Sequence, residues 1–183
     1  MYFLVFDTET TGFKARNRLV QLAWQLYRED ELVEEKDFLV KPYGFTIPRE
    51  VVAIHGITTE MATAKGLPLR TVLREFRKAL HQADYVVGHN IEYDIKVVHD
   101  EFFRMRMFNL IMAKKKIDTM KASVDYVKLP PAKSFTRYKY PKLSELYRFL
   151  FGRDFEDAHN AMADVRATAR CFFELRRRGV IRV

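Results

Sequence analysis

Apolar and polar positions along this chain follow two periods, and the first of them is the period of strands. Tyr2–Asp7 is a continuous apolar run that ends in an acid, which is typical of a strand at the centre of a sheet. Two further strand-like runs follow at Leu19–Tyr27 and Leu32–Val40, and the polar residues Glu29-Asp30-Glu31 between them indicate a turn. This part of the chain therefore predicts a central strand followed by a hairpin.

The period of an amphipathic helix begins at Leu69–His81, where apolar residues recur at every third or fourth position. Strands first and then alternating helices and strands predict an α/β fold, in which a mixed β-sheet is flanked by α-helices. The remaining expected elements are a strand at Tyr85–Val87, a helix at Asp94–Met105, an edge strand at Ile117–Thr119, a helix at Ser144–Phe151 that Gly152 ends, and a helix at Ala161–Arg178 that Gly179 caps.

Length and cysteine content narrow the class of protein. At 183 residues, with no linker or repeat, the sequence predicts one domain over residues 1–183. The one cysteine, Cys171, allows no intrachain disulfide and suits a reducing compartment. The start has no basic segment or cleavage site typical of a signal peptide, and no apolar run approaches the roughly 20 residues of a membrane span. We therefore expect a cytoplasmic protein without membrane partners.

Charge is unevenly distributed along the chain. The net charge is +8, but residues 1–100 hold 13 Lys and Arg against 15 Asp and Glu, whereas residues 101–183 hold 19 against 9. Ala113–Lys142 alone contains nine basic and two acidic side chains. A basic cluster of this kind predicts a nucleic-acid partner, with a merely solvated lysine-rich face as the alternative.

The first candidate site residues are Asp7 and Glu9. Two residues apart on a strand, their carboxylates lie on one face, and Gly12 can turn the chain just beyond them. Ionised carboxylates this close repel each other, and a divalent cation reverses that repulsion. The alternative is a surface pair beside a turn, but the five apolar or aromatic residues before Asp7 place the pair at a buried strand end.

Asp94 is the third candidate, next to a short expected strand. By itself it is better explained as a helix-capping or first-turn acid, a common role that contributes about 1 kcal/mol. Glu92 is a rival carboxylate in the same segment. The sequence pattern alone leaves both alternatives open.

His159 and Asp164 complete the set. If His159 lies in the loop before the last helix, Asp164 can point from that helix to the same metal, and a neutral imidazole can take a proton from water. The alternative is an ordinary surface histidine that pairs with Asp157. Four carboxylates without a cysteine cluster suit Mg²⁺ or Mn²⁺, and two such ions about 3.5–4 Å apart suit hydrolysis of a phosphodiester.

Three segments of the sequence resemble, in order, the signature segments of the DEDDh 3′–5′ exonucleases. They are Phe6–Gly12 (FDTETTG), His89–Asp94 (HNxxxD) and His159–Asp164 (HNAMAD), and the resemblance spans Phe3 to about Leu175. It implies a ribonuclease-H-like fold. It also implies that Asp7, Glu9, Asp94 and Asp164 bind the metal ions and that His159 is the base. Asn160 stands where the related branch of the family has a tyrosine, which excludes that branch.

A fourth segment is similar to the PxE…HGI segment of the proofreading type. Here it reads Pro48-Arg49-Glu50 and His55-Gly56-Ile57. The resemblance implies contacts to the 3′-terminal nucleotide from Glu50 and His55, with Thr10 and Thr11 approaching it through backbone and hydroxyl groups. Asn90 is a further candidate substrate contact. The alternatives are a helix-start acid for Glu50 and a turn residue for His55.

The region at 127–141 departs from the family pattern because it is rich in both bases and aromatics. Interleaved cations and aromatic rings suit a single-stranded nucleic acid, whereas the alternative is a loop that packs its own aromatics. No segment of the sequence points to a polymerase partner. The residues concerned are Lys128, Lys133, Phe135, Arg137, Tyr138, Lys139 and Tyr140.

The sequence thus predicts a metal-dependent 3′–5′ exonuclease that releases nucleoside 5′-monophosphates from single-stranded DNA ends. One alternative is an exoribonuclease that acts on RNA ends or short oligoribonucleotides, because no residue fixes the choice of sugar. A non-catalytic nucleic-acid-binding module is the alternative from another class, and the intact acids and histidine speak against it.

Overall fold

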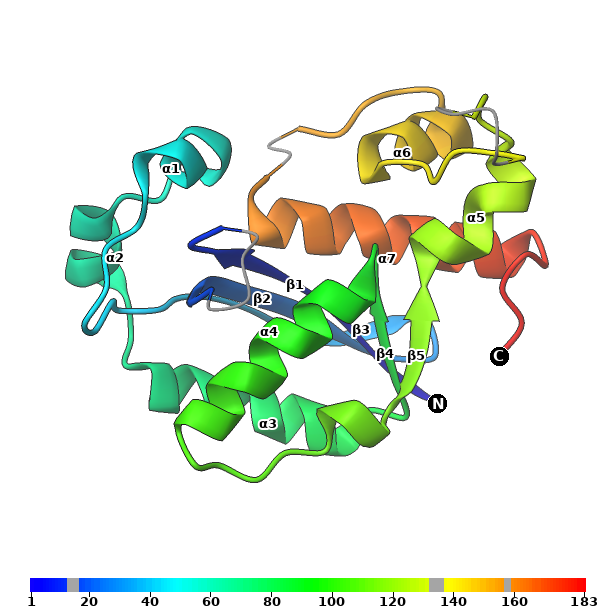
Figure 1. The fold of residues 1–183 in the computed structure, drawn as a ribbon. Coiled ribbons are helices and arrows are strands. Elements are labelled where there is room, and N and C mark those ends of the chain that lie inside the picture. The colour runs from blue at the N-terminus through cyan, green and yellow to red at the C-terminus, as the bar shows by residue number, and fades with distance from the viewer. Residues whose placement is uncertain (13–16, 132–136, 157–158) are drawn as a thin grey trace.

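A mixed sheet forms the centre of the computed structural model, which describes residues 1–12, 17–131, 137–156 and 159–183 (Figure 1). Within these residues the strand order is β3-β2-β1-β4-β5, with β1–β2 and β2–β3 antiparallel and β1–β4 and β4–β5 parallel. The mixed sheet predicted from the sequence is therefore confirmed. The strands are β1 (Tyr2–Thr10), β2 (Leu19–Arg28), β3 (Glu31–Leu39), β4 (Tyr85–Gly88) and β5 (Lys115–Asp118).

Strand β1 is central, as its continuous apolar run predicts. It pairs with β2 along its length and with β4 over Phe3–Val5 only, so its last residues extend beyond β4. The strand ends at Thr10, not at Asp7 as the sequence had indicated. Asp7 and Glu9 therefore lie inside the strand, because β2 supplies hydrogen-bonding partners beyond the apolar run.

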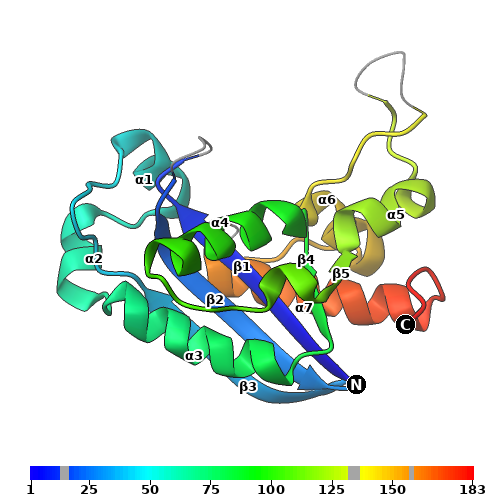
Figure 2. The same cartoon turned by 60° about the horizontal axis from the view of Figure 1, so that its bottom comes forward.

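Helices cover both faces of the sheet (Figures 1 and 2). Alternate residues of β1 separate the two cores: Leu4 and Phe6 pack with α3 and α4, whereas Phe3 and Val5 pack with α6 and α7. The helices are α1 (Arg49–His55), α2 (Thr59–Lys65), α3 (Leu69–Gln82), α4 (Ile91–Arg104), the 3₁₀ turn η1 (Ile111–Ala113), α5 (Thr119–Val127), α6 (Leu143–Phe151) and α7 (Ala161–Arg177).

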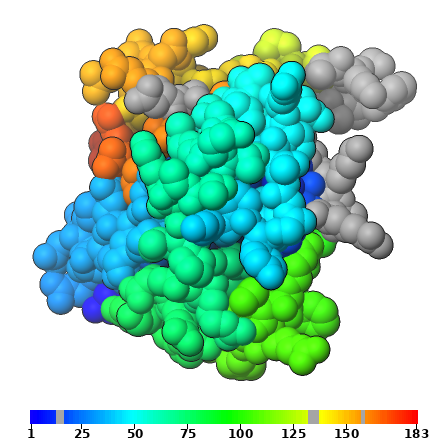
Figure 3. All heavy atoms as spheres, turned by 90° about the vertical axis from the view of Figure 1, so that its left-hand side faces the viewer, coloured from blue at the N-terminus to red at the C-terminus, as the bar shows by residue number. Residues whose placement is uncertain are grey.

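Three helices were not expected from the sequence. Helices α1 and α2 have seven residues each and α5 has nine, and so short a segment carries little periodic signal. Helices α1 and α2 make the end of the molecule that faces the viewer in Figure 3. Helix α4 begins at Ile91, three residues before the expected start at Asp94, because Asn90 adopts the left-handed conformation and reverses the chain there.

Glu101 on α4 is a fully buried acid. Its Oε1 accepts hydrogen bonds from Arg18 Nε and from the backbone N–H of Leu19, both at 3.0 Å, and lies 3.0 Å from Arg104 Nη1. Leu19 begins β2, so this acid fixes the start of β2 against α4. That start lies close to the end of β1, where the candidate acids are.

Glu101→Ala is expected to lower the free energy of unfolding by about 2–4 kcal/mol, because it leaves a buried N–H and a partly buried guanidinium without their acceptor. Urea denaturation measures this change. Glu92→Ala on the same helix is the control, since Glu92 is half exposed and its ion pair with Lys116 is expected to contribute less than about 1 kcal/mol. Equal effects of the two substitutions would contradict the anchoring role of Glu101.

Among the helices of the described residues, none is both long enough and apolar enough to cross a membrane.

Candidate functional site

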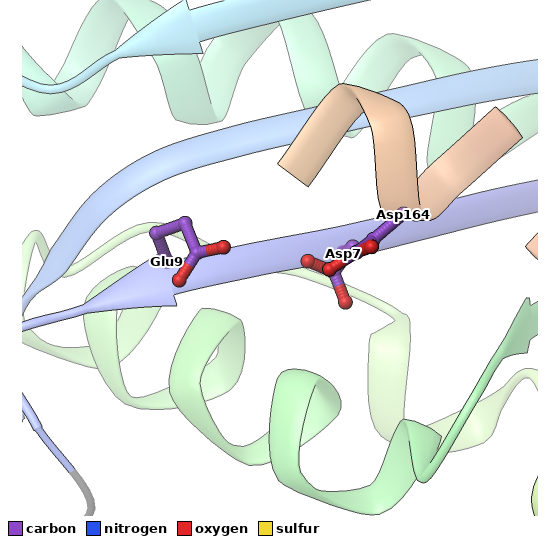
Figure 4. A group of neighbouring side chains, drawn as sticks. All are labelled: Asp7, Glu9 and Asp164. Atoms are coloured by element: carbon purple, nitrogen blue, oxygen red, sulfur yellow. The ribbon is translucent and has the colours of Figure 1, made fainter. Parts of the chain in front are cut away.

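Three of the predicted acids meet at the end of β1. Asp7 and Glu9 on β1 and Asp164 on α7 each offer a carboxylate oxygen, and these oxygens all lie within 4.8 Å of one another (Figure 4). Asp7 and Glu9 share the face of β1 that carries Phe3 and Val5, as their spacing of two residues predicts. Asp164 reaches them because α7 packs on that face. Such a group of oxygen ligands suits a hard divalent cation.

Asp94 lies beside this group, in the first turn of α4. It is 4% exposed, and its Oδ1 accepts hydrogen bonds from Thr8 N at 3.1 Å and from Thr8 Oγ1 at 2.6 Å. These bonds fix the carboxylate next to the strand that carries Asp7 and Glu9. The rival Glu92 is instead 52% exposed and pairs with Lys116, so the structure favours Asp94.

Electrostatics of the four acids indicate a site built for cations. Burial, together with repulsion from the neighbouring acids, raises the pKa of Asp7 well above its ordinary value and that of Glu9 to about 8. Burial also raises the pKa of Asp94 to about 7, against the hydrogen bonds from Thr8, and that of Asp164 to about 6. Positive charge among these oxygens would remove the repulsion.

These shifts predict how the stability of the metal-free protein changes with pH. A carboxyl whose pKa is raised on folding binds its proton more tightly in the folded state, so stability is lost as the pH rises through the folded pKa. With values of about 7 for Asp94 and about 8 for Glu9, we expect the free energy of unfolding in EDTA to fall by about 2–3 kcal/mol between pH 6.5 and pH 8.5.

Thermal unfolding in EDTA measures this loss as a decrease of about 4–12 °C in Tm. Burial lowers the pKa of His55 and of His89, so the unfolded state binds more protons at these two rings, and their contribution opposes a minor part of this loss near pH 6.5. Added Mn²⁺ should raise Tm more at pH 8.5 than at pH 6.5, since metal binding displaces protons. A Tm that does not depend on pH would contradict the repulsion among the acids.

His159 lies in the loop just before α7, where the sequence placed it. Its backbone is left-handed, with φ of 70°, its side chain is exposed, and its N–H donates to Asp164 Oδ2 at 3.2 Å. Asn160 caps α7 by accepting hydrogen bonds from the first free backbone N–H groups of the helix. The backbone of His159 is thus hydrogen-bonded to Asp164, one of the clustered acids, which holds the residue next to them. Asp157, its alternative partner, lies outside the described residues.

Gln21 is a site residue that the sequence analysis missed. It is 4% exposed, lies opposite Glu9 in the β1–β2 register, and its Oε1 accepts from Ala161 N at 3.4 Å while its Nε2 donates to Asp37 at 2.8 Å. It therefore holds the start of α7, which carries Asp164, against the sheet. A polar residue at an inward position of the apolar run Leu19–Tyr27 was the available signal.

The predicted substrate residues gather beyond the end of β1. Thr11 and Glu50 line one cavity of about 420 Å³, together with Gly12 and the apolar side chains of Val51 and Ile54. Glu50 lies in the first turn of α1, which agrees with its alternative interpretation as a helix-start acid as well. The cavity follows the acids directly along the chain, because Glu9 lies only two residues before Thr11, which lines the cavity.

His55 and Thr10 are in contact through the backbone. His55 ends α1, its Nδ1 accepts from Ile57 N at 3.1 Å, and burial lowers the pKa of the ring while the Thr10 backbone opposes this shift. The Thr10 hydroxyl is buried and donates to Gly12 O at 2.7 Å, so it is used within the protein.

Asn90 lies in the turn between β4 and α4, and the described residues 137–141 of the basic, aromatic region come just before α6. The Asn90 side chain is exposed and does not cap α4, while its backbone N–H donates to Asp118 Oδ1 at 3.0 Å. In the aromatic region, the Arg137 guanidinium lies 5.2 Å from the centre of the Tyr138 ring. Lys133 and Phe135 lie outside the described residues.

Comparison with protein families gives a match over most of the chain. The model of an exonuclease family, that of RNase T, matches residues 4–172. Among individual proteins, the chain is 30% identical over 172 residues to a PolC-type DNA polymerase III of Streptococcus suis and 29% identical over 180 residues to that of Lactococcus lactis. In both cases the match covers 93% of this chain and about a tenth of the relative, 11% and 10% respectively.

Solved structures give the same fold. Escherichia coli exonuclease I in complex with an oligonucleotide superposes with a TM-score of 0.80 and 24% sequence identity, covering 97% of this chain and 41% of that one. A zinc-bound form of the exonuclease I–single-stranded DNA complex also gives 0.80 and 24%. The chain thus spans about two fifths of the length of these structures, and the predicted ribonuclease-H-like fold is confirmed.

Proposed function

The chain belongs to the exonuclease family whose model matches residues 4–172, as the DEDDh segments had indicated, and on this basis we propose that it removes nucleotides one at a time from the 3′ ends of single-stranded DNA. The observation that carries the proposal is the group of carboxylates from Asp7, Glu9 and Asp164, with Asp94 and His159 beside it. We treat residues 1–183 as one exonuclease domain.

The four acids fit a pair of hard divalent ions, Mg²⁺ or Mn²⁺. All offer carboxylate oxygens, and burial together with mutual repulsion raises the pKa of Asp7 and of Glu9, which is the repulsion that bound cations would offset. Two bound ions would supply charge that activates water and stabilises the leaving oxygen of a phosphodiester. Thr8 holds Asp94 in place by two hydrogen bonds, and Gln21 holds the start of α7, which carries Asp164.

His159 is the proposed general base. Its exposed imidazole can meet a water molecule, and the hydrogen bond from its backbone N–H to Asp164 keeps the residue beside the clustered acids. A proton taken from water by the imidazole leaves an attacking hydroxide equivalent, and the products are a nucleoside 5′-monophosphate and a strand shortened by one nucleotide.

The cavity lined by Thr11 and Glu50 is the proposed site of the 3′-terminal nucleotide. Its apolar residues Val51 and Ile54 suit a base or sugar, and its volume of about 420 Å³ is within the range of small-ligand pockets. His55 and the Thr10 backbone adjoin it. DNA is favoured over RNA because exonuclease I, the structural relative, is solved with single-stranded DNA. An exoribonuclease remains the alternative, since no described contact selects the sugar.

A 5′-labelled single-stranded DNA oligomer and its RNA equivalent, incubated with Mg²⁺, Mn²⁺ or EDTA beside Asp164→Ala, test the function. We expect a ladder that shortens from the 3′ end in the presence of metal and is absent with the variant, with the faster substrate identifying the sugar. A protein that binds both oligomers but degrades neither would be a non-catalytic nucleic-acid-binding module. Because the relatives are PolC-type DNA polymerases, a polymerase is also a candidate partner. A pull-down with this protein as bait, in the presence of primed template DNA, would test whether it binds one.

A further inference from the structure

Residues 137–142, here called the strip, carry bases and exposed aromatics just before α6. Tyr140 is 57% exposed, and Arg137 lies against the Tyr138 ring with its guanidinium 5.2 Å from the ring centre. Aromatic rings that stack on bases beside cations that follow the backbone are a common way to bind single strands. The strip therefore has the composition of a nucleic-acid contact, but composition does not say where it sits relative to the acids.

Three hydrogen bonds fix the strip to its own neighbourhood. Lys139 N donates to Leu129 O at 3.1 Å, Lys139 Nζ donates to Glu145 at 2.6 Å, and Lys142 N donates to Glu145 Oε2 at 2.7 Å. These contacts join it to the end of α5 and the start of α6. None of the three joins it to the sheet.

His89 makes a contact of a different kind. It lies in the turn between β4 and α4, and its Nε2 is 2.9 Å from Pro141 O, so it links the strip to the end of the sheet where the acids lie. Because the Pro141 carbonyl oxygen can only accept a hydrogen bond, His89 Nε2 carries the proton and donates this bond. On the other side of the ring, Nδ1 lies 3.0 Å from Thr119 Oγ1, and Thr119 is fully buried. The ring is thus held from both sides and has little freedom to move.

The turn that carries His89 also leads to one of the acids. Asn90 is left-handed, with φ of 68°, and its N–H donates to Asp118 Oδ1 at 3.0 Å, which ties the turn to the start of α5. Asp94 follows on the first turn of α4, where Thr8 holds its carboxylate. One rigid turn therefore stands between the strip and the acids.

We propose that His89 is a positioning residue that latches the strip beside the clustered carboxylates, where Tyr140 and Arg137 contact the single strand behind its 3′ end. This inference rests on the proposed exonuclease function. It implies that the latch affects long substrates, which extend past the active site to the strip, more than dinucleotides.

Two substitutions of His89 distinguish its proposed role in positioning the strip from any other role of this side chain. The amide nitrogen of Gln occupies about the place of the histidine Nε2 and can still donate to Pro141 O, whereas that of Asn occupies about the place of Nδ1 and cannot reach it. For His89→Asn we expect the ratio of kcat/KM on a 12-nucleotide DNA to that on a dinucleotide to fall about tenfold, mainly through KM, as lost stacking and one lost hydrogen bond imply. His89→Gln should restore most of the ratio.

Tyr140→Ala supplies a test that does not depend on folding, because this side chain is exposed. It should lower the same ratio, and the double variant with His89→Asn should be no worse than about the larger single effect, since both act through one contact. Tyr43→Ala is the matched control, an aromatic that is 90% exposed outside the strip, and should leave the ratio unchanged.

The possible outcomes distinguish a failure of the proposed exonuclease function from a failure of the proposed role of His89. A wild-type protein that degrades neither substrate contradicts the exonuclease function itself. If the wild type is active but His89→Asn lowers kcat equally on both substrates, or His89→Gln behaves like His89→Asn, His89 does not act through the strip and the inference is overturned. Additive effects of His89→Asn and Tyr140→Ala would also overturn it.

Discussion

Asp7→Asn is expected to lower turnover about 1,000-fold or more while making the metal-free protein more stable. The amide keeps the shape of the side chain but removes a negative charge and a strong oxygen ligand from the cluster with Glu9 and Asp164. Loss of a metal ligand removes several kcal/mol of transition-state stabilisation, and about 4 kcal/mol corresponds to a 1,000-fold loss of rate. Single-turnover cleavage of a labelled oligomer in Mn²⁺ measures the loss.

The stability of the metal-free Asp7→Asn variant should increase, although its activity is lost. Burial and three neighbouring acids raise the pKa of Asp7, so its ionised form is unfavourable in the folded protein without metal. A neutral amide relieves this repulsion, and we expect Tm in EDTA at pH 8 to rise by about 2–8 °C. Asp30→Asn in the exposed β2–β3 turn is the control and should change neither quantity. A lower Tm for Asp7→Asn would mean that the Asp7 carboxylate makes a stabilising contact.

His159→Ala is expected to lower kcat about 100- to 10,000-fold, the usual contribution of a positioned general base. Binding should be retained, because the imidazole is exposed and the bond to Asp164 is made by the backbone N–H, which alanine keeps. The measurements are kcat on a DNA oligomer, the dissociation constant of the oligomer in Ca²⁺, and the rise of Tm with Mn²⁺. Of these three quantities, only kcat should change.

Two further measurements test the assignment of the base. Imidazole added to the buffer should restore part of the activity of His159→Ala, since the exposed position leaves room for it. His159→Asn checks the backbone, because asparagine tolerates the left-handed conformation that His159 adopts with φ of 70°. His81→Ala, at the exposed end of α3, should have wild-type kcat. Wild-type turnover of His159→Ala would show that another group takes the proton.

The regular elements that the sequence predicted are those whose signal is local. The apolar run of β1, the hairpin of β2 and β3, and the helical periods of α3, α6 and α7 depend on residues within a few positions of one another. The shared face of Asp7 and Glu9 has the same origin, because successive side chains of a strand alternate between its faces. The short helices α1, α2 and α5 carry too few residues to show a period, and the packing around them decides their form.

The sequence by itself predicted the succession of strands and long helices along the chain, and its three signature segments pointed to the family and, through it, to the proposed acids and histidine. Tertiary structure alone decided which of Glu92 and Asp94 is buried against β1, and that Gln21 holds the start of α7. It also brought Pro141 to His89, 52 positions away. These choices depend on contacts between residues far apart in the chain, and no local pattern of polarity specifies which distant backbone will meet a given side chain.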